Sequence, residues 1–314
     1  MLRQVEIPGK GQGLIATTQI PVGTILIEEF PLITINGDPN PYAVQEIVTK
    51  FQHLTEEQKN QVLSLHDPGP ASFQGRSLPF TFAERTEEKV VRIFMTNSIS
   101  LCGHTEMNVN KSGLYETISR INHSCAPNVV WSWLKRDESR SVKQVRVCRK
   151  IREGEEILAS YCGNADKFPS KNERQMKLKT TWNFSCNCEV CSLTGDKLME
   201  NEKARKRISD LHEAIASKAL IGLVEPALKD AKEKLKIMKS IKDEMILDLP
   251  AALMECCELA AHCKLSRSNA AELMKKAKEM SELHGDCYVY NYNEEEKKIK
   301  RIQRFPSSVS YERQ

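Results

Sequence analysis

The sequence predicts an α+β protein, and three observations support this class. Two stretches, about residues 1–35 and 112–162, are rich in β-branched residues and broken by turn signals. Between them, at about 36–96, apolar residues recur at helical spacing. After about residue 195 the composition shifts to Glu, Lys, Ala and Leu with almost no Pro or Gly, which favours helices.

The first β stretch contains "GLIATTQI" and "TILIEEF", separated by "PVG". Val, Ile and Thr fit a pleated strand, whereas Pro and Gly interrupt it. We expect two or three short strands within residues 1–35.

The segment that follows is a predicted helical insert within the β framework. Pro-rich punctuation at "GDPNP" and "DPGP" flanks "TEEQKNQVLSLH", and "TEEKVVRIFMTN" comes later. Thr55 and Thr86 are suitable N-caps, and the acidic residues after each suit the positive end of a helix.

Strands return in the second β stretch, at "NVVWSWL", "KQVRVCRKI" and "EEILASYC", with a turn at "REGE". The last of these predicted strands ends near Tyr161.

The C-terminal region reads as three or four amphipathic helices, continuing to about residue 304. Two apolar stripes predict their buried faces: Ile208, Leu211, Ile215 and Ala219, then Leu228, Leu235, Met238, Ile241 and Met245. We interpret "KARKR", residues 203–207, as the solvated basic face of a helix, with a nuclear-targeting signal as the alternative.

Charge and composition restrict the class of protein. The chain has 46 basic and 42 acidic side chains, a formal net charge of +4, so no strong overall field favours nucleic acid or acidic lipid. No apolar run reaches the roughly 18 residues of a membrane span, and the N-terminus lacks a secretory pattern. We therefore expect an intracellular protein, of the cytoplasm, the nucleus or both. Its 11 cysteines are odd in number, which favours reduced thiols over disulfides.

Three cysteines crowd into "FSCNCEVC", and this spacing suits thiolates that converge on one zinc ion. The alternative is three thiols without a metal. A tetrahedral zinc site needs a fourth ligand, and the candidates are a histidine, Cys102, Cys125, Cys148 and Cys162. We select Cys125, because it lies at a break in the chain just before Pro127. The predicted zinc ligands are Cys125, Cys186, Cys188 and Cys191.

Four blocks now carry a resemblance, in order: "GKGQGLIATTQIPVGTILIEE", "GLYETISRINHSCAPN", "REGEEILASYCG" and "WNFSCNCEVC". Together they resemble the SET-domain lysine methyltransferases with a cysteine-rich post-SET segment, and most closely the SET and MYND domain (SMYD) subfamily. The C-terminal helical region matches this subfamily only in its helical character, not in a sequence motif. Residues 36–96 contain no cysteine, so we expect a SMYD-like protein without the MYND zinc finger.

The resemblance implies a SET-type β core divided by the insert, a zinc-binding post-SET loop and an all-helical C-terminal domain. The implied boundaries are 1–36 and 97–165 for the two parts of the SET core, 37–96 for the insert, 166–194 for the post-SET zinc segment and 195–314 for the helical domain.

The resemblance also implies that S-adenosylmethionine is the methyl donor. It assigns cofactor contacts to Lys10, Gly11, Gln12, Gly13, Asn97, Asn122, His123, Tyr161 and Phe184. Glycines at the first of these blocks would let backbone approach the cofactor closely.

Tyr161 matches the catalytic tyrosine of the family, and Ile99, Tyr115 and Trp182 match the residues of its lysine channel. Ile99 stands where the subfamily has Phe, and Trp182 where it has Tyr, so the number of methyl groups transferred does not follow. The implied partner is a protein lysine, on a histone or another protein. Neutralising that amine at pH 7 costs about 4–5 kcal/mol, and an apolar channel lowers its pKa.

Two other functions are consistent with parts of the sequence. One is a SET-like scaffold that binds cofactor or peptide without turnover and recruits partners through its helices. The other is a nucleic-acid-binding zinc module that uses the basic strand "KQVRVCRK". The second is disfavoured, because Lys143, Arg146, Arg149 and Lys150 do not share one strand face and no aromatic residue interleaves them.

Overall fold

The structure is a computed structural model that describes residues 1–37, 43–70, 85–100, 111–135, 141–162, 168–263, 269–284 and 292–304. Cys102, one of the candidate fourth zinc ligands, lies outside these residues. The chain divides into two compact units. Unit 1 comprises residues 1–123 and 128–159, and unit 2 comprises residues 124–127 and 160–314.

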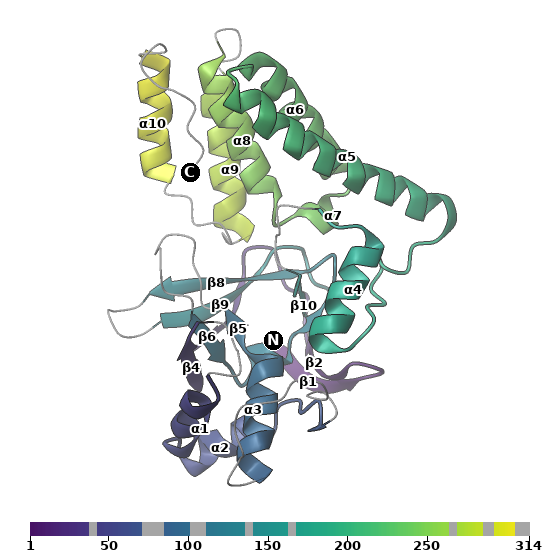
Figure 1. The fold of residues 1–314 in the computed structure, drawn as a ribbon, viewed down its shortest axis with the longest axis vertical. Coiled ribbons are helices and arrows are strands. Elements are labelled where there is room, and N and C mark those ends of the chain that lie inside the picture. The colour runs from purple at the N-terminus through teal and green to yellow at the C-terminus, as the bar shows by residue number, and fades with distance from the viewer. Residues whose placement is uncertain are drawn as a thin grey trace. The chain divides into compact units, whose positions relative to one another are not determined.

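Small sheets build the β framework of unit 1 (Figure 1). β1 and β2 form an antiparallel hairpin, β3, β9 and β8 form a second sheet, β4, β6 and β5 form a third, and β7 pairs in parallel with β10. The strands are β1 (Leu2–Ile7), β2 (Gly11–Ala16), β3 (Ile25–Glu29), β4 (Ile33–Asn36), β5 (Ile99–Ser100), β6 (Lys111–Leu114), β7 (Asn122–His123), β8 (Val129–Lys135), β9 (Ser141–Val147) and β10 (Leu158–Ala159).

The predicted strands are present, but their number and length differ from expectation. Residues 1–36 hold four strands rather than two or three, since β1 pairs with β2 along its whole length. "EEILASYC" contributes only the two residues of β10, because the chain leaves the sheet once Ala159 has paired with His123.

The described part of the insert in unit 1 contains three helices: α1 (Val44–Gln52), α2 (Glu56–Leu63) and α3 (Arg85–Asn97). Their apolar faces share a core with β4 and β6 that includes Ile47, Val62 and Phe94. Thr55 caps α2 as predicted, and Gln58 completes a capping box with it. The prediction for Thr86 is wrong, because α3 already begins at Arg85 and Thr86 therefore lies in its first turn.

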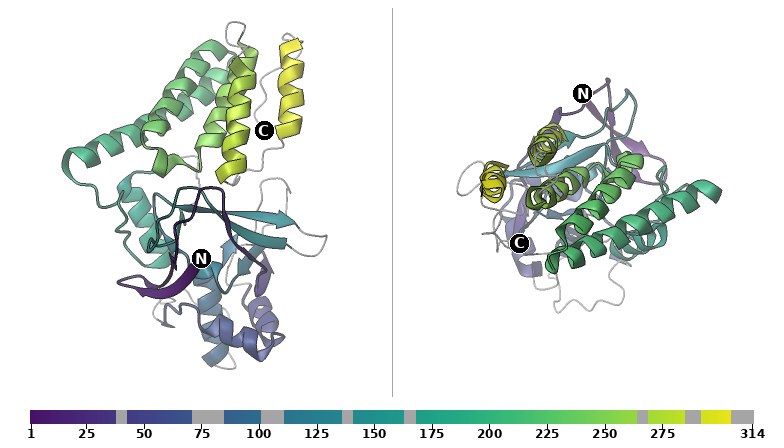
Figure 2. Two further views of the ribbon diagram at one scale, coloured as in Figure 1. Left: turned by 180° about the vertical axis from the view of Figure 1, so that it is seen from behind. Right: turned by 90° about the horizontal axis from the view of Figure 1, so that it is seen from above.

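Unit 2 is helical after its first segment, with α4 (Lys171–Trp182), α5 (Gly195–Leu220), α6 (Val224–Ser240), α7 (Lys242–Met245), α8 (Leu249–His262), α9 (Ala270–His284) and α10 (Tyr292–Arg304). Figure 2 shows the green helices α5 and α6 running side by side, with α8 and α9 next to them. Together with the sheets of unit 1, these helices confirm the predicted α+β class.

One core holds the C-terminal helices together, and it contains the predicted stripe residues Ile208, Ile215, Leu228 and Leu235. The described residues of this region contain six helices, where three or four were expected. The second stripe divides between α6 and α7, because the chain leaves helical geometry at Ile241.

The basic segment "KARKR" is not a wholly solvated face. Lys206 and Arg207 are exposed, but Arg205 is buried and forms an ion pair with Glu244. The interpretation was therefore wrong for Arg205, because α7 supplies an acidic partner that the local sequence does not reveal.

Among the residues that the structure describes, no helix combines the length and apolarity required to cross a bilayer.

Candidate functional site

Of the predicted cofactor residues, Lys10 lies in the turn between β1 and β2, and Gly11, Gln12 and Gly13 begin β2. Gly11 has a φ of 73°, a left-handed conformation that glycine adopts without strain, and the space beside its Cα is open. Gly13 is closely packed. A Cβ there would lie 2.6 Å from Ile7 Cγ1 and 2.8 Å from Asn122 Nδ2.

Glu156 joins this turn to the Asn-His pair. Its Oε2 accepts from Lys10 Nζ at 2.7 Å, and its Oε1 accepts from Asn122 Nδ2 at 2.9 Å. Asn122 Nδ2 also lies 3.2 Å from the Gln12 carbonyl oxygen. The structure therefore brings the first predicted cofactor block against the second, through an acidic residue that sequence reasoning missed.

His123 is buried beside Asn122 on the short strand β7. The turn that leads into β7 includes the 3-10 helix Ile118–Arg120 and is held from a distant strand. Glu29, at the end of β3, accepts backbone N–H groups of Glu116 at 2.7 Å, Thr117 at 3.0 Å and Ile118 at 2.9 Å. Burial raises the pKa of Glu29, although these three hydrogen bonds lower it.

Ile99 and Tyr115, two predicted channel residues, lie in the same apolar cluster of unit 1. Tyr115 is fully buried, and its hydroxyl has no hydrogen-bond partner among the described residues. Burial raises the pKa of this hydroxyl, and the charge of Glu29 adds to the effect.

Asn97 ends α3, and its side-chain amide donates to the carbonyl oxygens of Ile93 at 2.6 Å and His66 at 2.8 Å. Its backbone oxygen accepts from Ser119 Oγ at 3.0 Å. Both amide hydrogens are thus used within unit 1, which leaves Oδ1 as the side-chain group for any cofactor contact.

In unit 2, three aromatic rings that the sequence singled out pack together. The Tyr161 ring centroid lies 5.3 Å from that of Trp182 and 6.3 Å from that of Phe184, the latter edge to face. Trp182 is the last residue of α4, and Asn183 ends the helix in a left-handed conformation with φ 58°. This turn lets Trp182 and Phe184 both pack against the ring of Tyr161.

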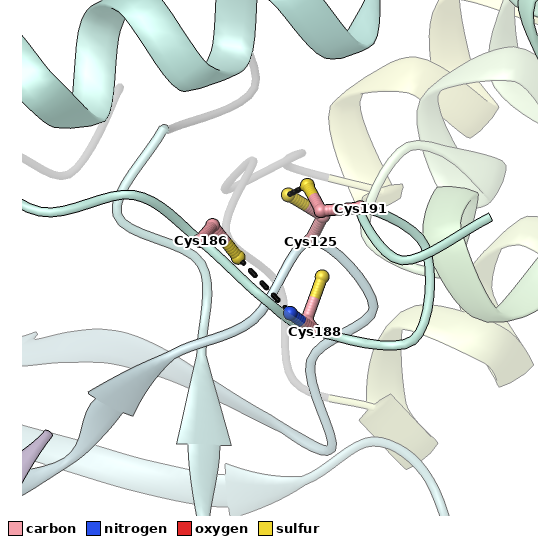
Figure 3. Close-up of side chains that lie close together, drawn as sticks. All are labelled: Cys125, Cys186, Cys188 and Cys191. Carbon is pink, nitrogen blue, oxygen red and sulfur yellow. Dashed lines mark hydrogen bonds between the residues drawn. The ribbon is translucent and has the colours of Figure 1, made fainter. Parts of the chain in front are cut away.

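The four predicted metal ligands also meet in unit 2. Figure 3 shows Cys125, Cys186, Cys188 and Cys191 around one point, and their sulfur atoms all lie within 4.8 Å of one another. Cys125 Sγ and Cys191 Sγ are 3.5 Å apart, and the Cys188 backbone N–H donates to Cys186 Sγ at 3.5 Å. Zn–S bonds of about 2.3 Å in a tetrahedron require sulfur separations of roughly 3.8 Å. The four sulfurs can therefore hold a zinc ion.

The four thiols influence one another's pKa. Hydrogen bonding with the three other sulfurs raises the pKa of Cys125 and lowers that of Cys188. Hydrogen bonds from Cys125 and Cys186 lower the pKa of Cys191 to about 7. A thiolate is the form that binds a metal, and a bound cation would lower the pKa of all four thiols.

The other candidate fourth ligands have different positions. Cys148 is fully buried in unit 1, and Cys162 is buried near the cluster but is not one of the four converging sulfurs. Cys256, Cys257 and Cys263 are buried in the helical core, as structural thiols would be.

The basic strand is engaged within unit 1. Lys143 is buried and donates to the Ser100 carbonyl oxygen at 2.8 Å, and Arg146 donates to the Gly23 carbonyl oxygen at 2.9 Å. These two cations are held by the fold, which does not favour the nucleic-acid alternative.

Comparison with known proteins points to one domain family. The SET domain family model matches residues 11–162. Histone-lysine N-methyltransferase set5 of Schizosaccharomyces pombe is 28% identical over 233 residues, 74% of this chain and 63% of that protein. Human N-lysine methyltransferase SMYD2 is 28% identical over 149 residues, 48% of this chain and 30% of that protein.

A crystal structure of the SET domain of LSMT bound to lysine and AdoHcy aligns with 99% of this chain and 89% of that chain, at 12% identity. The TM-score of this alignment is 0.37. The matched regions span less than two thirds of either curated relative. The family model places a SET domain in residues 11–162, and the names of the two relatives agree with it.

Proposed function

We propose that this chain is a protein-lysine N-methyltransferase that uses S-adenosylmethionine. The SET-domain match supports this proposal. The two relatives also support it, since one is named a histone-lysine and the other an N-lysine methyltransferase. Their shared substrate class is a lysine side chain, and histones are the first substrates to test.

The residues of unit 1 suit a cofactor with both polar and charged groups. The open space beside Gly11 leaves backbone accessible, and the side chain of Asn122 contacts the carbonyl oxygen of Gln12, the next residue. We assign cofactor contacts to Lys10, Gly11, Gln12, Gly13, Asn97, Asn122, His123 and, from unit 2, Tyr161 and Phe184. Bound S-adenosylmethionine would supply a methyl group already activated by the sulfonium.

The remaining task of the protein is to hold a lysine amine neutral and aligned. Ile99, Tyr115 and Trp182 are apolar or aromatic, and we assign them to the wall of the lysine channel. Such walls remove water from the amine and lower its pKa, which offsets the roughly 4–5 kcal/mol cost of deprotonation at pH 7.

The proposal depends most on the position of Tyr161. Its ring is packed by Trp182 and Phe184, so its hydroxyl has little freedom to reorient. It lies at the end of the SET-domain match, one residue before its last position. We assign it the role of orienting the amine and stabilising the charge that moves during transfer.

The test is Tyr161→Phe, assayed with radiolabelled S-adenosylmethionine against recombinant histones and a cell lysate. We expect a loss of at least about 100-fold in turnover, the size seen when a preorganised donor is removed. Cofactor affinity, measured by calorimetry, should stay within a few fold. Tyr292→Phe, the same change outside residues 11–162, is the matched control.

Measuring cofactor binding and methyl transfer separately also distinguishes a methyltransferase from the alternative function, a scaffold without turnover. A scaffold would bind S-adenosylmethionine and transfer no methyl group to any protein, in the wild type as in the variant. Turnover that survives in Tyr161→Phe would refute the role of Tyr161.

We also propose that Cys125, Cys186, Cys188 and Cys191 hold one structural zinc ion. Their separations suit a tetrahedral thiolate site. Zinc thiolates require reduced cysteines, so we propose that the protein works in a reducing compartment, the cytoplasm or the nucleus.

A further inference from the structure

Arg174 is a buried cation beside the sulfur cluster. It lies on α4 and is only 3% exposed. Its Nη1 donates to the Pro169 carbonyl oxygen at 2.7 Å, whereas Nε and Nη2 have no hydrogen-bond partner in the described part of the chain. A buried guanidinium with idle donors is costly, so this side chain needs a further partner.

The sulfur atoms are nearby groups suited to its charge, since Arg174 and Cys125 line the same pocket of unit 2. Four thiolates around one Zn²⁺ carry a net charge of −2, in surroundings that include the buried side chains of Leu178 and Val190. Arg174 offers both a counter-charge and two free donors to such a group.

A binding site for a small anion is the competing interpretation. Arg174 borders a pocket of about 50 Å³ within unit 2, and Cys125 lies on the same wall. The pocket also has Glu244 and Asp248 on its lining, and Glu244 already pairs with Arg205. These carboxylates disfavour an anion, so the thiolates are the better match for the charge of Arg174.

The neighbouring residue on α4 fixes the metal loop. Gln175 Nε2 donates to the Cys186 carbonyl oxygen at 2.6 Å, and the Cys186 N–H donates to Gln175 Oε1 at 2.9 Å. Lys177 Nζ donates to the Cys162 carbonyl oxygen at 2.6 Å. α4 is therefore tied to the metal loop by the residue after Arg174, and to Cys162 two residues further along the helix.

We propose that Arg174 is a positioning residue of the metal site, whose guanidinium donates to the thiolates of Cys125 and Cys191 and balances the charge of the zinc–thiolate group. This inference rests on the proposed zinc ion. Because outer partners of metal ligands typically change metal affinity by about 10- to 100-fold, removal of Arg174 should have an effect of that size.

The experiment begins with the zinc content of the purified full-length chain, measured by mass spectrometry, which should be one ion per chain. Zinc affinity is then measured by competition with a chromogenic chelator. Arg174→Met should lower it about 10- to 100-fold, and Arg174→Lys should recover part of the loss because it keeps the charge. Lys179→Met, which removes an exposed charge from the same helix, is the control and should stay within about 3-fold.

A second readout separates this role from a purely structural one. In cobalt-substituted protein, loss of a donor and a positive charge should move the sulfur-to-cobalt charge-transfer band to longer wavelength. Arg174→Lys should shift it in the same direction by less, and this variant decides the question if Arg174→Met does not fold. Unchanged zinc affinity with an unchanged band would overturn the inference, whereas a wild-type chain without zinc would overturn the metal site itself.

Discussion

Glu29→Gln tests how the fold positions the Asn-His pair. Gln keeps one carbonyl oxygen, which can retain the N–H groups of Glu116 and Thr117, but it turns the second oxygen into an amide nitrogen. The Ile118 N–H, which donates to that second oxygen at 2.9 Å, then faces a donor.

The expected cost follows from this one lost acceptor. A buried N–H without an acceptor costs about 1–3 kcal/mol. The lost charge adds nothing, because burial raises the pKa of Glu29 and the charged form is therefore not favoured by folding. We expect Glu29→Gln to lower the free energy of unfolding by about 2 kcal/mol.

Urea unfolding followed by circular dichroism measures this loss, and hydrogen exchange of a peptide spanning Glu116–Ile118 locates it. The backbone amides there should exchange faster in the variant. Glu6→Gln, at an exposed position on β1, is the control and should change stability by less than about 0.5 kcal/mol. If Glu29→Gln were as mild as this control, with unchanged exchange, the reasoning would be refuted.

Two further predictions concern unit 1. Gly13→Ala should lower stability by about 1–3 kcal/mol in urea unfolding, because its Cβ would press on Ile7 and Asn122; a wild-type midpoint would contradict the close packing. Asp67 accepts two hydrogen bonds from Arg92, each 2.8 Å long. Hydrogen bonding to Arg92 is the largest cause that lowers the pKa of Asp67 below its ordinary value of 3.8. The stability it contributes is present above about pH 3.8 and is lost as pH falls through the lowered pKa. Asp67→Asn should therefore cost more at pH 7 than at pH 3, and an equal cost at both would exclude the ion pair as its source.

Much of the candidate site follows from local spacing. The Cys-x-Cys-x-x-Cys run restricts three sulfurs to one short loop, so it predicts a metal whatever the rest of the chain does. Apolar periodicity likewise predicts the buried stripes of α5 and α6, because helix geometry alone decides which residues share a face.

The partners of charged residues could not be predicted in this way. Glu155 and Glu156 are adjacent and alike in sequence, yet Glu155 accepts from its own turn at Arg152, whereas Glu156 accepts from Lys10, 146 residues away. A residue's neighbours at such separation depend on how the strands pair.

By itself, then, the sequence determined the chemistry available to this protein: the thiols, the tyrosine at the end of the matched region, and the glycines at the start of β2. Only the tertiary structure decided that Glu156 joins Lys10 to Asn122, that Arg205 is buried against Glu244, and that Arg174 lies beside the sulfurs. The physical reason is that spacing along the chain controls which groups share a turn or a helix face, whereas the pairing of a buried charge depends on elements brought together from distant parts of the chain.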